Sequence, residues 1–152
     1  MRINREHNTS EIKCMLSDCG LKATPQRIII YAALLSSQQH PTAEKIKELI
    51  QMDQPGISLG TVYKTLDTFV QAGLANRVFS DAGTLRYDAC TENHHHIYCT
   101  NTKEIVDFED PELQQLLNNY FKSKQLHNLK IQDIRLQIHA EKIDPEKHIS
   151  IQ

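Results

Sequence analysis

The fold is decided by residues 58–88, which read SLGTVYKTLDTFVQAGLANRVFSDAGTLRYD. Ser58 is placed to cap a helix over 59–72, whose apolar residues recur at the spacing of one helix face: Val62, Leu66, Phe69 and Val70. Gly73 follows, in the position where glycine commonly ends a helix. Two extended segments, 74–79 and 84–88, then flank a turn composed of Ser80, Asp81, Ala82 and Gly83. This order predicts a helix followed directly by a β-hairpin.

Three helices are predicted before this stretch from their start signals. Ser10 is placed to cap the first helix, which Gly20 ends. Thr24 precedes Pro25, a proline at the first position of a helix that runs to about Ser36. The third helix begins at Thr42, places Ile46, Leu49 and Ile50 on one face, and stops at Pro55 and Gly56. Two compact helices joined by a short turn and followed by a hairpin indicate a winged helix-turn-helix over residues 1–88; a helical bundle with an attached hairpin remains the alternative.

Composition bounds the size and class of the protein. The 152 residues allow one ordinary domain or two small lobes, and 39% hydrophobic with 24% charged residues is typical of a folded chain. No apolar run approaches the ~18 residues of a membrane span, and the N-terminus lacks a signal core, so we expect a cytoplasmic protein. Ten basic residues oppose nine acidic ones over 1–88, and seven oppose ten over 89–152. DNA binding would therefore need a local basic surface, helped by a second copy in a dimer.

The pattern changes after a predicted hinge at residues 89–93. Two strands, 94–100 and 104–109, precede an amphipathic helix over 111–123 and a strand over 129–139. We expect inward apolar residues on the helix (Leu113, Leu116, Leu117, Phe121) and on the last strand (Ile131, Ile134, Leu136, Ile138). Such a ββαβ lobe is too small to bury a generous core alone. The sequence thus predicts an α+β protein whose residues 94–152 form a dimerisation domain with a polar tail.

A run of three histidines, residues 94–96, opens this second lobe. On a strand His94 and His96 share one face, and His95 points to the other. If Asn101 and Thr102 form a two-residue hairpin loop, His96 lies opposite Asp107. Imidazoles with carboxylates suit Fe(II), Mn(II), Zn(II) or Ni(II) and not the thiophilic Cu(I). A polar sheet edge without metal is the alternative.

At the level of motifs the chain resembles the Fur (ferric uptake regulator) family, and within it the peroxide-responsive PerR branch. The matching segments are GLKATPQR (20–27), HPTAEKI (40–46), SLGTVYKTLDTFVQAGL (58–74), LRYD (85–88), HHH (94–96) and EIVDFEDPEL (104–113). The resemblance implies a DNA-binding winged helix, a dimerisation domain and one regulatory divalent metal per subunit at the hinge. The family's ligand positions match His40, Asp88, His94, His96 and Asp107.

The resemblance also implies a mechanism. One ion bonded to both lobes would fix their relative angle and favour the DNA-binding dimer. Two Asp ligands resemble the peroxide sensors, in which bound Fe(II) leads to oxidation of a ligand histidine, here His40 or His94, and to release from DNA. This is single-use chemistry, so an enzyme is not expected. A repressor that responds to iron, manganese or zinc without oxidation is the alternative, and a non-haem Fe(II) oxygenase using His94, His96 and Asp107 is a remote one.

The cysteines depart from the family's usual pattern. Most members hold a structural zinc with two CxxC pairs, whereas the four cysteines here stand at 14, 19, 90 and 99 with no such pair. We expect no four-cysteine zinc site and a packed thiol at Cys99, with recruitment of His139 or His148 beside it as the alternative. The accessory metal site of some relatives is also expected to be absent or weak, because Asn93, His95, Gln114 and Ile134 align with it.

DNA contacts are expected from two segments. Lys22, Thr24 and Arg27 resemble the family's phosphate and minor-groove contacts, and the recognition helix offers Thr61, Tyr63, Lys64 and Thr65. Tyr63 is rotated by about 100° from Val62 on the helix, which favours exposure over a core position. Its ring can contact a thymine methyl group, and Lys64 can donate to guanine or phosphate. The resemblance implies a homodimer that binds AT-rich palindromic double-stranded DNA and no membrane.

Overall fold

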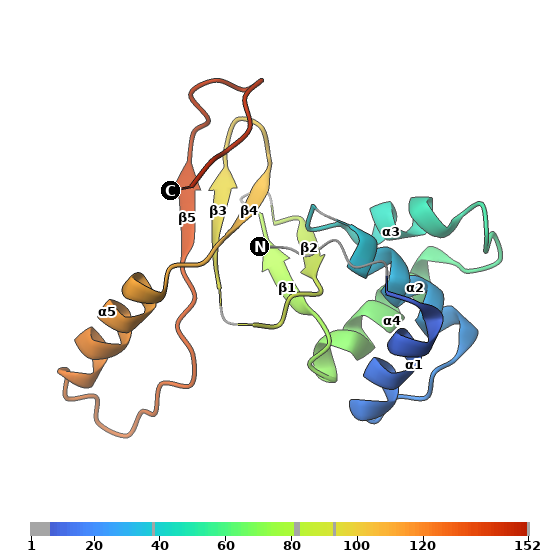
Figure 1. Ribbon diagram of the computed structural model, residues 1–152, viewed down its shortest axis with the longest axis horizontal. Helices are drawn as coiled ribbons and strands as arrows, with labels where there is room; N and C mark the ends of the chain where they lie inside the picture. The colour runs from blue at the N-terminus through green and yellow to red at the C-terminus, as the bar shows by residue number, and fades with distance from the viewer. Residues whose placement is uncertain (1–6, 38, 81–82, 93, 152) are drawn as a thin grey trace. The chain divides into compact units, whose positions relative to one another are not determined.

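The computed structural model describes residues 7–37, 39–80, 83–92 and 94–151 and divides the chain into two compact units, Met1–Thr91 and Glu92–Gln152 (Figure 1). The division after Thr91 falls inside the predicted hinge, whose residue 93 lies outside the described residues. The architecture is the predicted α+β combination of a winged helix and a small αβ lobe. Among the described residues, no helix has the length and apolar character needed to span a bilayer.

Four helices form the bulk of the first unit: α1 (Thr9–Asp18), α2 (Pro25–Ser36), α3 (Ala43–Ile50) and α4 (Leu59–Gln71). The side chains of Thr24, Thr42 and Ser58 each accept a backbone N–H of the helix that follows, so these three predicted caps are confirmed. The predicted cap Ser10 is wrong. Asn8 caps α1 instead, because its side-chain oxygen accepts the N–H of Glu11 and the helix begins before Ser10.

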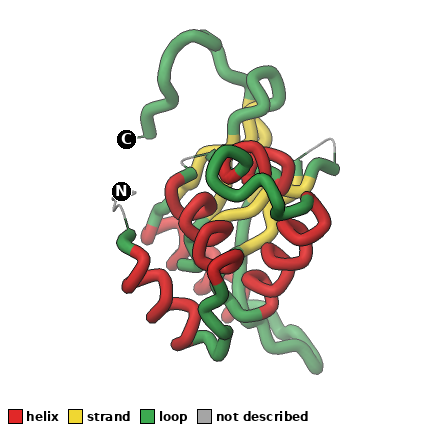
Figure 2. Tube along the Cα trace, turned by 90° about the vertical axis from the view of Figure 1, so that its right-hand side faces the viewer, coloured by secondary structure: helices red, strands yellow, loops and turns green. Residues whose placement is uncertain are grey.

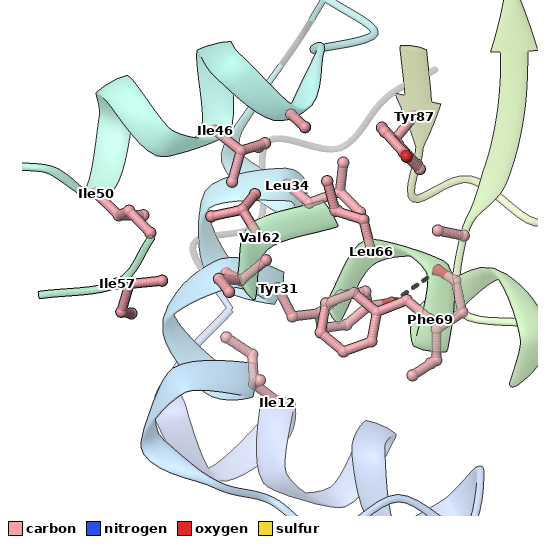
Figure 3. Close-up of a cluster of buried hydrophobic side chains, with 14 of the residues drawn as sticks. Ile12, Tyr31, Leu34, Ile46, Ile50, Ile57, Val62, Leu66, Phe69 and Tyr87 are labelled. Atoms are coloured by element: carbon pink, nitrogen blue, oxygen red, sulfur yellow. Dashed lines mark hydrogen bonds between the residues drawn. The ribbon is translucent and has the colours of Figure 1, made fainter. Parts of the chain in front are cut away.

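The four helices share one core, drawn in Figure 3. Leu66 and Phe69 of α4 are fully buried, and Phe69 meets Tyr31 of α2 edge to face at 5.1 Å between ring centroids. The Tyr31 hydroxyl donates to the carbonyl of Leu74, at 3.3 Å, and so ties α2 to the residue after α4. The prediction for Leu49 is wrong: it is 46% exposed, because Ile46 and Ile50 with Ala43 fill the inward side of the short helix α3.

The wing consists of β1 (Asn76–Phe79) and β2 (Leu85–Asp88), paired antiparallel with Asn76 opposite Asp88. The predicted turn at 80–83 is only partly visible, since Asp81 and Ala82 lie outside the described residues. Tyr87 of β2 is fully buried against the helical core (Figure 3). Because neighbouring side chains on a strand alternate, burying Tyr87 fixes the position of Asp88 at the strand end.

The second unit contains β3 (His95–Cys99), β4 (Ile105–Phe108), α5 (Pro111–Lys122) and β5 (Gln137–Ala140). The sheet order is β4-β3-β5, antiparallel between β3 and β4 and parallel between β3 and β5 (Figure 1). His96 pairs with Asp107, as predicted. The connecting turn is longer than predicted, because residues 100–104 all lie outside the strands and Lys103 adopts a left-handed φ of 63°. The register is nevertheless the predicted one, and the Cys99 N–H still donates to the Glu104 carbonyl at 2.9 Å.

Two predictions for the second unit are wrong. The last strand begins at Gln137 rather than at 129, and residues 123–136 form a loop, coloured green in Figure 2. Helix α5 buries none of its residues, and Leu116 is 63% exposed. Of the predicted inward residues, Leu113, Leu117, Phe121, Ile134 and Leu136 are only partly buried, and Leu116, Ile131 and Ile138 are exposed.

The tail after β5 is attached to the β3–β4 turn by a small polar cluster. Asn101 exchanges two hydrogen bonds with the backbone of Lys142, donating to its carbonyl at 2.9 Å and accepting its N–H at 3.0 Å. The Lys142 ammonium donates to Glu104 at 3.0 Å, and Thr102 donates to the same carboxylate at 2.8 Å. These contacts hold the end of β5 beside the turn.

Candidate functional site

The first pair of predicted metal ligands, His40 and Asp88, meets within the first unit. Their Nε2 and Oδ2 atoms lie 3.2 Å apart. Two further hydrogen bonds attach the 40–41 segment to β2: Tyr87 N–H donates to the Pro41 carbonyl at 2.9 Å, and Arg86 donates to the His40 carbonyl at 3.1 Å. The strand therefore positions both ligands, one as its own last residue and one through the segment bonded beside it.

The carboxylate of Asp88 is also oriented from its other side. Its Oδ1 atom accepts the backbone N–H of Cys90 at 2.9 Å, which leaves Oδ2 directed at the His40 ring. Hydrogen bonding of the second oxygen holds a ligand carboxylate in one orientation before a metal binds.

The remaining three predicted ligands, His94, His96 and Asp107, come together in the second unit. The Nε2 atoms of the two histidines lie 3.1 Å apart, and each lies 3.5 Å from Oδ1 of Asp107. The β3–β4 register produces this arrangement, because it pairs His96 with Asp107 across the hairpin. The prediction that these three side chains share one face is confirmed.

The tautomer of His94 follows from its second ring nitrogen. Nδ1 lies 2.6 Å from the carbonyl oxygen of Glu92, which can only accept, so Nδ1 must donate. In the neutral ring Nε2 then carries the lone pair, directed toward His96 and Asp107. A carbonyl that fixes the tautomer in this way is the usual outer-shell partner of a metal-binding histidine.

His95 is directed elsewhere and has a structural role. Its Nδ1 accepts the backbone N–H of Leu136 at 3.1 Å, and the residue is 1% exposed. This bond joins β3 to the residue that precedes β5. The middle histidine of the run thus connects the parallel strands β3 and β5, which agrees with its predicted direction away from the ligand face.

The spacing of both ligand sets fits a first-row divalent ion. Such ions bind His nitrogen and carboxylate oxygen at about 2.0–2.2 Å, so two ligands at 90–109° around one ion are about 3.0–3.5 Å apart. The separations of 3.1, 3.2 and 3.5 Å match this range. Both sets consist of His and Asp groups that could hold a metal ion, and their nitrogen and oxygen donors suit Fe(II), Mn(II) or Zn(II). Two ligands in one unit and three in the other each make an incomplete set.

The cysteines contribute no such set among the described residues. Cys14 is exposed in the middle of α1 and Cys19 is exposed at its C-cap, whereas Cys99 is buried in β3. In the β3–β5 register Cys99 neighbours Ala140, and His139 neighbours Tyr98, with which it makes a ring contact at 5.7 Å. His139 therefore lies on the face opposite Cys99, so its predicted alternative role beside that thiol is wrong.

The predicted DNA contacts gather around one hollow on the first unit. Six of the seven line it, together with Gln26 and Thr68: Lys22, Thr24, Arg27, Thr61, Lys64 and Thr65. The N-terminus of α2 and the exposed side of α4 form its walls, and Lys22, Arg27 and Lys64 make it basic. Thr65 is only 9% exposed and can contact a ligand in the hollow by its edge alone.

Tyr63 is the predicted contact that does not line the hollow. The expected exposure is only half right, because the ring is partly buried against the core. Its hydroxyl donates to Glu44 of α3 at 2.6 Å. This bond lowers the pKa of the Glu44 carboxyl and raises that of the Tyr63 phenol.

Sequence reasoning missed three groups that orient these side chains: Arg86, Glu92 and Glu44. The carbonyl of Glu92 carries no side-chain signal at all. In the sequence, Glu44 is an acidic residue in the first turn of a predicted helix, and favourable interaction with the helix dipole is enough to explain it there. Only the tertiary structure shows that it faces Tyr63.

Comparisons of the sequence and of the structure with known proteins point to the same group of relatives. The model of the ferric uptake regulator family matches residues 18–139. The chain is 37% identical over 111 residues to the peroxide-responsive repressor PerR of Staphylococcus aureus (strain Mu50), covering 73% of this chain and 75% of that protein. Its fold is similar to that of the Pseudomonas aeruginosa ferric uptake regulator with manganese (TM-score 0.73, 28% identity, 87% of this chain and 98% of that one). It is also similar to the Helicobacter pylori ferric uptake regulator (TM-score 0.77, 22% identity, 97% and 100% covered).

Proposed function

The chain belongs to the ferric uptake regulator family, and we propose that it is a metal-responsive, DNA-binding transcriptional repressor. In this proposal His40, Asp88, His94, His96 and Asp107 hold one regulatory divalent ion per subunit. The observation that carries it is the ligand spacing: each unit presents His and Asp atoms at the separations that one ion requires. A pair and a trio of ligands together complete a five-ligand nitrogen and oxygen set.

The proposed response is a shift of population between arrangements of the two units. An ion held by residues of both units favours arrangements in which the pair and the trio are close together, by its difference in affinity between those arrangements and others. Asp88 is the last residue of the wing strand β2, and His40 is hydrogen-bonded to that strand, so both transmit this restraint to the DNA-binding unit. Fixing the unit within a symmetric dimer sets the distance between two recognition helices, α4 and its copy, which must match two half-sites on DNA.

The peroxide response is the finer part of the proposal. It is supported by the two Asp ligands and by the 37% identity to the Staphylococcus aureus peroxide-responsive repressor. Fe(II), when bound, supplies the redox reactivity toward hydrogen peroxide. The side chains expected to gain oxygen are His40 and His94; an oxidised imidazole is a weaker ligand, so the DNA-binding arrangement is lost. The protein is consumed in this step rather than turning over, so it acts as a sensor and not as an enzyme.

A metal sensor without oxidation is the second candidate. It is favoured by the donor set itself, because Fe(II), Mn(II) and Zn(II) all bind such ligands and availability decides between them. The Pseudomonas aeruginosa relative, with 28% identity, is described with manganese. The oxygenase alternative is disfavoured, because five protein ligands would leave too few open positions for a substrate.

Mass spectrometry of peroxide-treated protein separates the two candidates. The Fe(II)-loaded and Mn(II)-loaded forms receive the same dose of hydrogen peroxide and are digested. Peroxide sensing predicts one added oxygen on the peptide of His40 or His94 in the Fe(II) form alone, with parallel loss of DNA binding. Unmodified histidines in the Fe(II) form, with intact DNA binding, would contradict peroxide sensing and leave the metal sensor.

Several accompanying expectations stay predictions. They are a homodimer on AT-rich palindromic DNA, a cytoplasmic location and the absence of a four-cysteine zinc site. The dimer is supported by the uncovered apolar side chains of the second unit, among them Leu116 on α5 and Leu129 and Ile131 in the loop that follows. A second copy would cover such side chains, as homodimer interfaces do.

A further inference from the structure

A carboxylate lies against the recognition helix, although its negative charge would repel the phosphates of bound DNA. Glu44 is exposed in the first turn of α3, and its Oε1 accepts the Tyr63 hydroxyl at 2.6 Å. The pKa of Glu44 is lowered, first by this bond, so the group stays charged at neutral pH. Lys64, which follows Tyr63, lines the basic hollow. A negative charge so near that surface should weaken the attraction for every DNA sequence alike.

The contact has a benefit that offsets this cost. Tyr63 is held from two sides: its ring packs partly on the helical core, and its hydroxyl is held by a charge-assisted bond, which is stronger than a neutral one. An aromatic side chain on the recognition helix that is already fixed in one rotamer loses less conformational freedom on binding. The exposed part of the ring is then presented to bases in a defined orientation.

We propose that Glu44 is a positioning residue for base recognition: it orients Tyr63 and thereby contributes sequence specificity while lowering general DNA affinity. The inference rests on the proposed function, since it needs Tyr63 to face DNA. The recognised chemistry is the apolar edge of a base, such as a thymine methyl group, which carries sequence information, whereas the phosphates do not.

The test compares two affinities for each variant. The probes are a duplex selected by the wild-type protein from a random library in Mn(II), and a scrambled duplex of the same composition. Glu44→Ala removes the bond, Glu44→Gln keeps an acceptor but not the charge, and Tyr63→Phe removes the donor and keeps the ring. Glu48→Ala is the matched control, because Glu48 is an exposed carboxylate one turn further along α3 that bonds to Lys45 and not to α4.

Glu44→Ala should weaken binding to the selected duplex about tenfold, the scale of a lost hydrogen bond to a charged group, while binding to the scrambled duplex is unchanged or tighter. Tyr63→Phe should show a similar loss, Glu44→Gln a smaller one, and the double variant Glu44→Ala/Tyr63→Phe no more than either single variant. Glu48→Ala should change both affinities in parallel. A purely structural role would lower both affinities together, and thermal melting of each variant monitors the fold.

Parallel tightening of both duplexes in Glu44→Ala, as in the control, would overturn the proposal, because Glu44 would then act only as a general negative charge. A parallel weakening would overturn it as well. A library from which the wild-type protein selects no sequence would contradict the proposed function itself. If instead the wild-type protein selects a sequence and Glu44→Ala keeps the same preference, only the role of Glu44 is refuted and the proposed function stands.

Discussion

The substitution Asp107→Ala tests the metal site at the residue that links both histidines of the second unit. Oδ1 of Asp107 lies 3.5 Å from Nε2 of His94 and of His96, and it supplies the only negative charge in that ligand set. Alanine removes this charge and leaves the two imidazoles in place. The variant should therefore still fold but bind divalent ions much more weakly.

The size of the effect follows from linkage between binding and unfolding. A ligand at 100 times its Kd stabilises the folded state by about 2.7 kcal/mol, which for a chain of this length raises the midpoint of thermal unfolding by about 5–11 °C. If Asp107→Ala weakens binding about 100-fold, the same Mn(II) concentration only equals the new Kd. The stabilisation then falls to about 0.4 kcal/mol, and the midpoint rises by roughly 1 °C.

Thermal unfolding with and without Mn(II) measures this difference directly. Glu109→Ala is a suitable control, because it removes an exposed carboxylate two residues away on the same segment. The control should keep the full Mn(II)-induced shift. An equal shift in wild-type protein and in Asp107→Ala would refute the assignment of Asp107 as a ligand, whatever the stability of the metal-free variant.

Three further predictions concern the scaffold. Leu66→Ala should lower the free energy of unfolding of the first unit by about 2–5 kcal/mol in a denaturant titration, because Leu66 is fully buried on α4; a loss below about 1 kcal/mol would contradict its place in the core. His95→Ala should lower the free energy of unfolding by about 1–3 kcal/mol, because the N–H of Leu136 loses its acceptor. Hydrogen exchange at the Leu136 amide should therefore become faster. The bond from Lys142, and after it that from Thr102, lowers the pKa of Glu104, so this carboxylate stabilises the fold above its unfolded pKa, and the stabilisation is lost as the pH falls through the folded pKa. Glu104 is 41% exposed, so Glu104→Gln should cost only about 0.2–1 kcal/mol at pH 7 and nothing at pH 3; an equal cost at both values would contradict the ion pair.

Local signals predicted much of the first unit. Thr24, Thr42 and Ser58 cap the helices they were expected to cap, because an N-cap bond involves only residues three apart. The pairing of His96 with Asp107 was also predictable, since a hairpin's register follows from the centre of its turn, even when the turn length is misjudged.

Elements that depend on distant partners were predicted less well. The alternation of Ile131, Ile134 and Leu136 indicated a strand, yet only the residues from Gln137 onward find β3 as a neighbour. Helix α5 has the predicted apolar face, but none of its residues is fully buried, and Leu116 is exposed. Apolar periodicity indicates that a face is suited to burial, but it does not show whether the same chain or a second copy buries it.

The ligand residues of the functional site were predictable from the sequence, but the groups that orient those ligands were not. Spacing indicated that His94 and His96 share a face, and the resemblance to a family added His40 and Asp88. The groups that orient them, such as the Glu92 carbonyl and the Arg86 guanidinium, depend on backbone geometry that no sequence pattern specifies.

The central claim is that the pair in the first unit and the trio in the second hold the same ion. Calorimetric titration of metal-free protein with Mn(II) tests it, using the wild-type chain, His40→Ala and His94→Ala. A shared ion predicts one Mn(II) per wild-type chain and a comparable loss of affinity for that single ion in both variants, although each variant alters only one unit. Two ions per wild-type chain, with each variant abolishing one and leaving the other at full affinity, would contradict the account.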